Sequence, residues 1–545
     1  MENLLSELRA KNPRFTKAPI SNFASSREIC PVIKKIISVC PAVRVNLFKK
    51  RALGFLAHPQ VPKDKSSCSA KSTDIGWHVI VFKLLREIVL QYSQWAKMRR
   101  LYGSSGSSPQ PPLKTVVLLI DEPPRDFLGL ALLGMHLLSQ GFRVVISDRP
   151  LGLLWKVFPG AVFVGKAGLR KVDSFQGSFA LHPAEGAHFQ EFNWRETVLD
   201  KYFVAAMARI RPEKVFVWGT EQEEILHDFD SGYRGVTVVT GAQRLDLCLK
   251  KNHWLSNRES TKLRADLGDF TLITTRFTTV LNVEPLRSLS SLLTRADRPL
   301  AAEIQANRWS QDSVDFGMFI VLIRRLLTEF PDRNFVVRPH PSENMAIYQK
   351  LFGHFSNLTI TRDGNLLPWL LASKLLVTSN STSGVEAALA GIPTVNLSSS
   401  VLPPTGQNIS VASEAGAVVH SVEEAVAACR LALEGPPRSV QQEWSDVARK
   451  RLANLSRDDA TTLIAESVAA MAAGKPPAGK PSLKQLGTLR RRNEILALAH
   501  SHPLGETIGL STAEVRRLFE EAPDHGFSKT RMVFSSYGTY VLEPV

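Results

Sequence analysis

The chain has 545 residues, of which 44% are hydrophobic and 22% charged, which allows two or three domains with sizeable cores. Its five cysteines have neither zinc-site nor disulfide-framework spacing, and this favours a reducing cytoplasm. No apolar run reaches the about 18 residues that a membrane-spanning helix needs. The first residues do not resemble a secretory signal, so we expect a cytoplasmic protein.

The net charge of +16 is concentrated near the beginning of the chain, where residues 1–100 contain 19 basic and 6 acidic residues. We interpret residues 1–72 as disordered or loosely ordered and residues 74–100 as a basic amphipathic helix. This helix can lie on an anionic membrane at the inner face of the cell membrane, or it can pack on the first domain. Residues 1–112, which end in a Gly/Ser/Pro linker, form the extension. Nucleic-acid binding is not expected, because no recognised motif accompanies the charge.

The first ordered unit is predicted from Lys114 onward. A strand at 115–121, a helix at 127–140 and a strand at 142–148 make a β-α-β unit, which is typical of a parallel sheet. The unit lacks Gly-x-Gly-x-x-Gly, so nothing marks a dinucleotide fingerprint. Further strands are predicted at residues 214–218, 236–239 and 270–274.

Two later apolar runs, 335–337 and 375–377, are predicted to be buried parallel strands that each end in a polar turn. Ligands of open α/β sheets bind outside the carboxyl ends of the strands, so the two turns should share one crevice. The turn from Ser379 to Gly384 offers hydroxyls, an amide and free helix N–H groups, which together suit a phosphate. Glu386 can accept hydrogen bonds from two ribose hydroxyls. The alternative is a Ser-rich cap on an ordinary helix.

The other strand end carries Arg338 and His340, with His340 between two prolines. A guanidinium and an imidazole at a strand end can neutralise a diphosphate or a monophosphate leaving group. We therefore predict a nucleotide site at the two turns. Its predicted residues are Arg338, Pro341, Ser379, Asn380, Ser381, Thr382, Ser383, Gly384 and Glu386, with His340 as a catalytic residue.

Three segments of this half resemble a known pattern: Arg338–Asn344, then Gly364–Leu370, then Ser381–Ala387. They are similar to the C-terminal half of GT-B-type enzymes, including UDP-N-acetylglucosamine epimerases and bacterial transferases of CMP-activated sugars. The pattern most resembles the surface carbohydrate biosynthesis protein family. The resemblance implies an α/β, GT-B-like fold of two Rossmann-like domains facing across a cleft. Residues 113–295 would then bind the acceptor and residues 296–474 the nucleotide sugar.

The resemblance extends into the first half, to about residues 114–470 altogether. Trp218-Gly219 followed by Gln222 is similar to the family's Trp-Gly-x-x-Gln. Val239–Asp246 is similar to its Val-Thr-Gly-Asn-Pro-Arg-Phe-Asp, with Ala and Gln in place of Asn and Pro. The resemblance places three residues of the latter segment at the cleft: Gly241, Arg244 and Asp246.

Related transferases carry an acidic pair before a glycine, one member of which is the general base. In the corresponding stretch, Leu181–Gly186, Glu185 remains while Pro183 and Ala184 replace the acids. The resemblance makes Glu185 the candidate base, because a carboxylate near an acceptor hydroxyl is what such a transfer needs. We expect no metal, since basic and amide groups can stabilise the leaving phosphate.

These observations predict a metal-independent glycosyltransferase that moves a nucleotide-activated sugar, preferably a CMP-linked acidic sugar, to a glycan or glycolipid in bacterial surface polysaccharide biosynthesis. Two alternatives stay open: an inactive scaffold that binds nucleotide, favoured by the altered acidic motif, and a sugar-nucleotide epimerase. Residues 475–545 are predicted to be a linker followed by a capped helix and a hairpin at 532–541. They form either a small appended module or an arm packed on the core.

Deletion of residues 1–110 should leave a folded core that binds nucleotide but associates less with anionic vesicles. Each basic residue near such a surface contributes about 1 kcal/mol, screened by salt. Co-sedimentation at low and high salt measures the effect. Equal binding by the full and truncated chains would reject the membrane interpretation, and an insoluble truncated chain would show that the helix at 74–100 belongs to the core.

Overall fold

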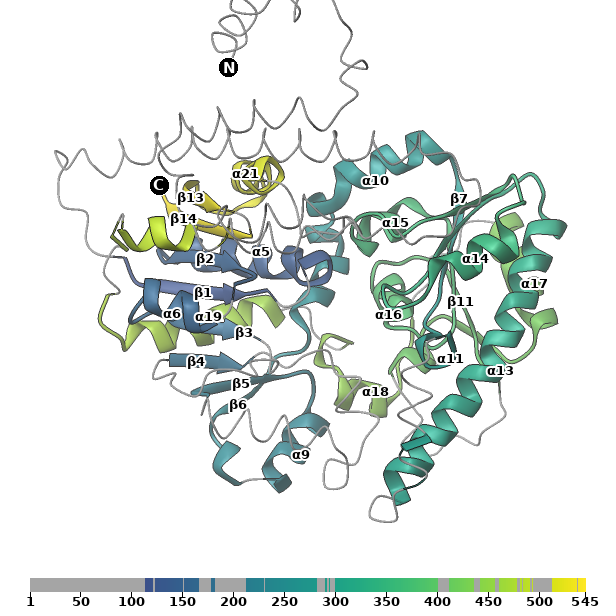
Figure 1. Cartoon of the computed structure of the whole chain (residues 1–545), viewed down its shortest axis with the longest axis horizontal. Coiled ribbons are helices and arrows are strands. Elements are labelled where there is room, and N and C mark those ends of the chain that lie inside the picture. Colours follow the sequence, from purple (N-terminus) through teal and green to yellow (C-terminus); the bar gives the residue numbers. More distant parts are fainter. Residues whose placement is uncertain are drawn as a thin grey trace, which may run out of the picture. The chain divides into compact units, whose positions relative to one another are not determined.

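The computed structural model of the chain contains two α/β sheets (Figure 1). It describes residues 113–545 with gaps at 121–122, 150, 166–177, 182–211, 230, 282–289, 292–293, 295–298, 400–410, 436–441, 456–459, 478–480, 483, 491–492, 494–511 and 537. The predicted helix at 74–100 and the predicted base Glu185 lie outside the described residues.

The first sheet has eight strands in the order β13-β14-β2-β1-β3-β4-β5-β6, and the strands from β2 to β6 pair in parallel. The predicted β-α-β unit is confirmed, with α5 between β1 and β2. The strands are β1 (Thr115–Leu119), β2 (Arg143–Ser147), β3 (Val162–Gly165), β4 (Ser178–Leu181), β5 (Lys214–Val217), β6 (Thr237–Val239), β13 (Thr530–Ser536) and β14 (Thr539–Pro544). Helices of this part include α5 (Pro123–Ser139), α6 (Leu151–Val157), α9 (Thr220–Phe229) and α10 (Trp254–Leu267).

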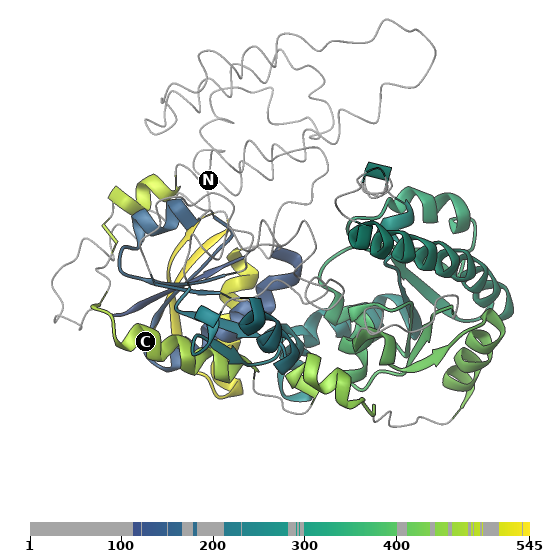
Figure 2. The same ribbon diagram turned by 90° about the horizontal axis from the view of Figure 1, so that it is seen from below.

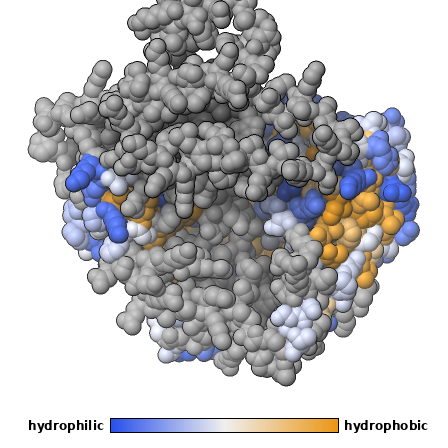
Figure 3. Space-filling model, in the orientation of Figure 1, coloured by the Kyte–Doolittle hydropathy of each residue, from blue (hydrophilic) through white to orange (hydrophobic). Residues whose placement is uncertain are grey.

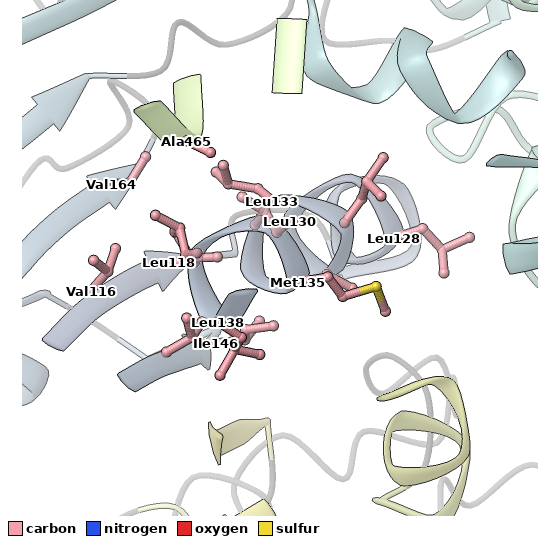
Figure 4. Close-up of a cluster of buried hydrophobic side chains, with 14 of the residues drawn as sticks. Val116, Leu118, Leu128, Leu130, Leu133, Met135, Leu138, Ile146, Val164 and Ala465 are labelled. Carbon is pink, nitrogen blue, oxygen red and sulfur yellow. The ribbon is translucent and has the colours of Figure 1, made fainter. Parts of the chain in front are cut away.

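Helix α5 lies at the centre of the first core (Figure 4). Its Leu130 and Leu133 belong to one buried cluster with Val116 and Leu118 of β1 and with Ala465 of α19 (Ala460–Ala473). Burial of each large aliphatic side chain stabilises the fold by about 1.5–3 kcal/mol. Helix α19, which follows the second sheet in the chain, therefore packs on the first sheet.

The second sheet has six parallel strands in the order β12-β11-β10-β7-β8-β9. They are β7 (Phe270–Thr274), β8 (Asn334–Arg338), β9 (Leu358–Ile360), β10 (Leu375–Thr378), β11 (Thr394–Leu397) and β12 (Ala417–Val419). The two predicted strands, 335–337 and 375–377, are thus confirmed as β8 and β10. The α/β fold class with two Rossmann-like sheets is also confirmed.

Helices cover both faces of the second sheet (Figure 1). One face packs against α13 (Pro299–Glu329) and α17 (Val422–Glu434), through residues such as Phe319 and Cys429. The other face packs against α15 (Leu366–Ala372) and α16 (Thr382–Leu389), through Leu370 and Ala387. Two shorter helices are α11 (Thr278–Leu281) and α14 (Met345–Phe352). Burial on both faces explains why the strands are continuous apolar runs.

The C-terminal hairpin is an arm of the first sheet, which resolves the choice that the sequence left open. Strand β14 pairs antiparallel with β2, and in Figure 2 the yellow hairpin runs beside the blue strands. Arg143 Nε lies 2.8 Å from Glu543 Oε1, and both side chains are buried. Ser147 Oγ and Thr539 Oγ1 are 2.7 Å apart. Helix α21 (Thr512–Glu521) packs against the hairpin.

Exposed apolar side chains gather over the region that Figure 1 labels α14 and α17 (Figure 3). Val321 on α13 and Leu431 on α17 are the most exposed large apolar residues within the helices that the structure describes. None of those helices is both long and apolar enough to cross a membrane.

Candidate functional site

Two glycines of the first sheet lie against a segment that returns from the second sheet. This return segment is described at residues 450–455 and 460–461, and it contains the end of α18 (Asp446–Arg451) and the 3-10 helix at Ala453–Leu455. A Cβ on Gly219 would lie 2.0 Å from the carbonyl oxygen of Lys450, and a Cβ on Gly241 would lie 2.1 Å from Asn454 Oδ1. The amide of Ala453 donates to the carbonyl of Trp218 at 2.7 Å. Close passage of the return segment therefore accounts for both glycines.

Asp246, predicted to line the cleft, is 2% exposed and holds the same segment. Its carboxylate accepts hydrogen bonds of 2.7 Å from Asn454 Nδ2 and from both the amide and the hydroxyl of Thr461. Burial raises the pKa of Asp246 to about 6, although these hydrogen bonds and the charge of Lys251 act in the opposite direction. The structure therefore gives Asp246 an anchoring role between distant parts of the chain.

Arg244, the third predicted cleft residue, contacts a helix of the second sheet. Its Nη2 lies 3.4 Å from Oε1 of Glu386 on α16, and each side chain is 13% exposed. The pair joins the first sheet's turn Gln243–Cys248, called η6, to the helix that follows the Ser/Thr turn. A predicted cleft residue and a predicted nucleotide-binding residue are thus in contact.

The guanidinium of Arg338, at the end of β8, contacts the backbone just before α15 and a side chain of α15. Its Nη1 and Nη2 donate to the carbonyls of Asp363 and Gly364 at 2.7 and 3.0 Å, and its guanidinium lies 4.9 Å from the ring centre of Trp369. Burial lowers the pKa of Arg338 to about 10, partly offset by the charge of Asp363. These contacts explain why Arg338, Gly364 and Trp369 occur together, while the nucleotide role of Arg338 stays a prediction.

Glu343 was not selected from the sequence. It holds the end of the turn that follows β8 and contains His340, here called the His340 turn. It is 3% exposed and accepts hydrogen bonds from Thr275 Oγ1 at 2.6 Å, from Tyr348 Oη at 2.8 Å and from the amide of Phe277. Burial raises its pKa. One feature of the sequence could have identified Glu343. It is an acid that directly follows the turn at the end of a predicted strand, and the neighbouring strand β7 is also followed by polar residues.

In the chain, His340 and Pro341 lie between Arg338 and Glu343, whose side chains are both held by hydrogen bonds. His340 is half-buried, and its Nδ1 accepts a hydrogen bond from the amide of Ser342 at 3.2 Å. A neutral imidazole that accepts through Nδ1 carries its proton on Nε2, so Nε2 is the donor. Pro341 is exposed, and its carbonyl accepts from Arg362 at 2.7 Å.

Several hydroxyls of the Ser/Thr turn bond to one another. Thr274 Oγ1 at the end of β7 lies 3.0 Å from Thr378 Oγ1 and 2.7 Å from Ser383 Oγ, and Ser383 Oγ donates to Ser381 Oγ at 3.0 Å. Ser381 also caps α16, because its hydroxyl accepts from the amide of Ser383. The Ser-rich cap that the sequence offered as an alternative is therefore present, and it includes Ser381 and Ser383.

Gly384 and Thr382 occupy the first turn of α16. A Cβ on Gly384 would lie 3.2 Å from the Cβ of Ala415, so packing between the helix and its neighbour favours glycine there. Thr382 is half-buried. Their predicted contact with nucleotide remains a prediction.

Ser379 and Asn380 differ from the rest of the turn. Ser379 is 1% exposed, and within the described part of the chain neither its Oγ nor Asn380 Oδ1 has a hydrogen-bond partner, although both atoms are buried. Asn380 has a left-handed φ of 43°, and its conformation is fixed by bonds of 2.8 Å to Asn396 Oδ1 and Ser398 Oγ. Left-handed backbone is uncommon for residues other than glycine. The turn thus holds two unpartnered polar atoms in a defined position.

The sheet order places the two turns at one edge. Strand β7 lies between β8 and β10, so these two strands are separated by two strand spacings, about 10 Å, and His340 and Ser379 follow their carboxyl ends. Arg276 follows β7 between them, and its Nη2 lies 3.3 Å from Asp312 Oδ1. The sequence reasoning missed Arg276, although it follows a predicted strand at the same edge. No group of three or more His, Cys, Asp or Glu side chains suited to a metal occurs among the residues that the structure describes.

Comparison with known proteins finds similar structures but no matching sequence family. No protein-family model and no curated protein sequence matches the chain. A structure of the wall teichoic acid polymerase TagF, as a variant with CDPG, is 13% identical, covering 74% of this chain and 98% of the chain in that structure, with a TM-score of 0.40. UDP-GlcNAc 2-epimerase from Methanocaldococcus jannaschii is 12% identical over 65% of this chain and 99% of that protein, with a TM-score of 0.40. A putative UDP-N-acetylglucosamine 2-epimerase from Listeria monocytogenes is 14% identical over 66% and 96%, also at 0.40. At these scores we transfer no residue role or activity from them.

The Asp246 anchor predicts a pH-dependent stability. The folded-state pKa of about 6 exceeds the ordinary 3.8, so the folded chain binds the proton more tightly. The contribution of Asp246 to the free energy of unfolding is therefore largest below about pH 4 and falls by about 3 kcal/mol as pH rises through 6. The variant Asp246→Asn lacks this titration. In urea unfolding between pH 4 and 7, the stability of wild type minus that of Asp246→Asn should decrease with pH. The control is Asp266→Asn, which changes an exposed aspartate. Parallel plots of unfolding free energy against pH for wild type and Asp246→Asn would contradict the predicted titration of Asp246.

Proposed function

We propose that the chain is a metal-independent glycosyltransferase that uses a nucleotide-activated sugar, with a CMP-linked acidic sugar favoured, in bacterial surface polysaccharide biosynthesis. The observation that carries the proposal is the pair of unpartnered buried atoms, Ser379 Oγ and Asn380 Oδ1, in the turn that begins α16. A buried polar atom without a partner costs about 1–3 kcal/mol. A ligand that bonds to these atoms offsets that cost, and a helix N-terminus favours a negatively charged ligand.

In this proposal the nucleotide phosphate binds at the Ser379–Gly384 turn. Glu386 accepts hydrogen bonds from the ribose hydroxyls. His340, with its proton on Nε2, donates to the leaving phosphate oxygen, and Arg338 adds positive charge from behind the turn. Preorganised donors aimed at developing charge usually lower the barrier of such a reaction more than any other single effect. Glu185 would deprotonate the hydroxyl of a glycan or glycolipid acceptor.

Two other functions stay open as alternatives. An inactive scaffold that binds nucleotide is favoured by Pro183 and Ala184, which stand where related transferases carry acids. A sugar-nucleotide epimerase is the third candidate. Nucleotide binding without release of nucleotide from any nucleotide sugar would favour the scaffold, and conversion of the sugar without transfer would favour the epimerase.

Nucleotides should raise the melting temperature, because a ligand that binds only the folded chain stabilises it. We expect CMP to act more strongly than UDP, and nucleotide sugars of CMP, UDP and GDP should be screened beside them at millimolar concentration. No shift with any nucleotide would contradict the proposal.

A matched pair of variants locates the nucleotide in this screen. Ser379→Ala removes a hydroxyl that has no partner, so the free protein should be as stable as wild type or slightly more stable, but its shift with CMP should shrink. Ser383→Ala breaks the hydroxyl cluster and should destabilise the free protein by about 1 kcal/mol. An unchanged CMP shift in Ser379→Ala would place the nucleotide elsewhere.

His340→Ala should lower turnover by about 10²-fold while the fold survives, as expected for loss of a group that stabilises the transition state. Turnover is measured as release of nucleotide from the nucleotide sugar that gives the largest thermal shift. Full activity of the variant would show that His340 takes no part in catalysis. An unfolded variant would show that His340 is needed for the fold. Circular dichroism of the same sample distinguishes these outcomes.

A further inference from the structure

The contact between Arg244 and Glu386 is part of a larger interface between η6 and α16. Ala242 and Leu245, which flank Arg244, are buried in one apolar cluster with Val385 and Ala388, which flank Glu386. The ion pair therefore lies beside an apolar contact between the same two elements. Such packing fixes the separation of the two backbones, so the charged side chains meet in a defined geometry.

Arg244 is also supported from within the first sheet. Gly129 of α5 packs against it, and a Cβ there would lie 3.4 Å from the Cα of Arg244, in van der Waals contact. Two residues further along, Asp246 holds the return segment through Asn454 and Thr461. The position of the guanidinium is thus set by the first sheet, whereas the carboxylate that it contacts belongs to the helix of the candidate nucleotide site.

A single contact of 3.4 Å in a partly buried setting is a weak stabiliser, because the desolvation of both charges offsets their attraction. The contact has a stronger effect on the position of the Glu386 side chain than on stability. The guanidinium restricts the rotamers of Glu386, and a carboxylate makes stronger hydrogen bonds than a neutral acceptor. A carboxylate has two oxygens with about four lone-pair sites, so pairing with one guanidinium is compatible with accepting hydroxyl donors as well.

We propose that Arg244 is a positioning residue that holds Glu386 so that its carboxylate receives both hydroxyls of the nucleotide's ribose. This inference rests on the proposed nucleotide site and adds to it the selection of ribose over 2′-deoxyribose. A 2′-deoxyribose lacks one of the two donors and therefore makes one hydrogen bond fewer to the carboxylate. The first sheet thereby takes part in nucleotide recognition without contacting the nucleotide.

The test compares the binding of CMP and 2′-deoxy-CMP by isothermal titration calorimetry. Wild type should bind CMP about tenfold more tightly than 2′-deoxy-CMP, the ratio expected for one hydrogen bond to a charged group. Arg244→Gln should weaken CMP about tenfold, leave 2′-deoxy-CMP nearly unchanged and so abolish the preference. Arg244→Lys should retain part of the preference, since an ammonium can still pair with Glu386.

Arg451→Gln is the matched control, because the buried Arg451 forms another ion pair, with its Nε 2.6 Å from Oε2 of the half-buried Glu221, and links the return segment to the first sheet. It should lower stability and keep the ribose preference. If Arg244→Gln does not fold, Arg244→Lys takes its place and should show a smaller preference than wild type, while Glu386→Gln should lose the preference. If Arg244→Gln folds, the double variant with Glu386→Gln should lose no more of the preference than either single one.

The outcomes separate the two proposals. An unchanged preference in Arg244→Gln, or equal weakening of both nucleotides, would overturn the positioning role alone. Equal binding of CMP and 2′-deoxy-CMP by wild type would do the same. Absence of binding by CMP, UDP and GDP nucleotides to wild type would overturn the proposed function and the inference together.

Discussion

The docking of the return segment on the carboxyl ends of β5 and β6 is the constraint on which the rest of the structure depends. It requires glycine at 219 and 241, and it buries the carboxylate of Asp246 among donors from Asn454 and Thr461. The same contacts fix η6, whose Arg244 reaches α16. A segment that leaves the second sheet thus determines how the first sheet presents Arg244 to the candidate site.

Polar residues at the edge of the second sheet divide into two groups. Most are used internally: Arg338 and Glu343 fix the His340 turn, while Thr274, Thr378 and Ser383 bond to one another. Ser379 and Asn380 have buried atoms that no described residue satisfies. The internally bonded residues hold the turns in a fixed conformation. The buried unpartnered atoms of Ser379 and Asn380 are therefore available in that conformation to bond to a ligand.

Local patterns predicted the strands well, because β1, β2, β7, β8 and β10 are buried on both faces and are therefore short apolar runs. Long-range partners were not predictable in the same way. Gly241 and Asp246 carry no mark of a segment some two hundred residues later, so they were assigned to a cleft. Arg338 likewise gives no local sign that its partners are the carbonyls of Asp363 and Gly364. The hairpin was predicted, but its pairing with β2 depends on an edge that the sequence does not reveal.

Amide hydrogen exchange with and without saturating CMP tests the central claim most directly, because it reports protection segment by segment. We predict slower exchange at residues 379–386 when CMP is bound. Residues 243–248 should be protected with them, because η6 packs on α16, and the distant hairpin of β13 and β14 should be unchanged. Unchanged exchange at 379–386 in a complex that calorimetry shows to be saturated would contradict the claim that this turn is the nucleotide site.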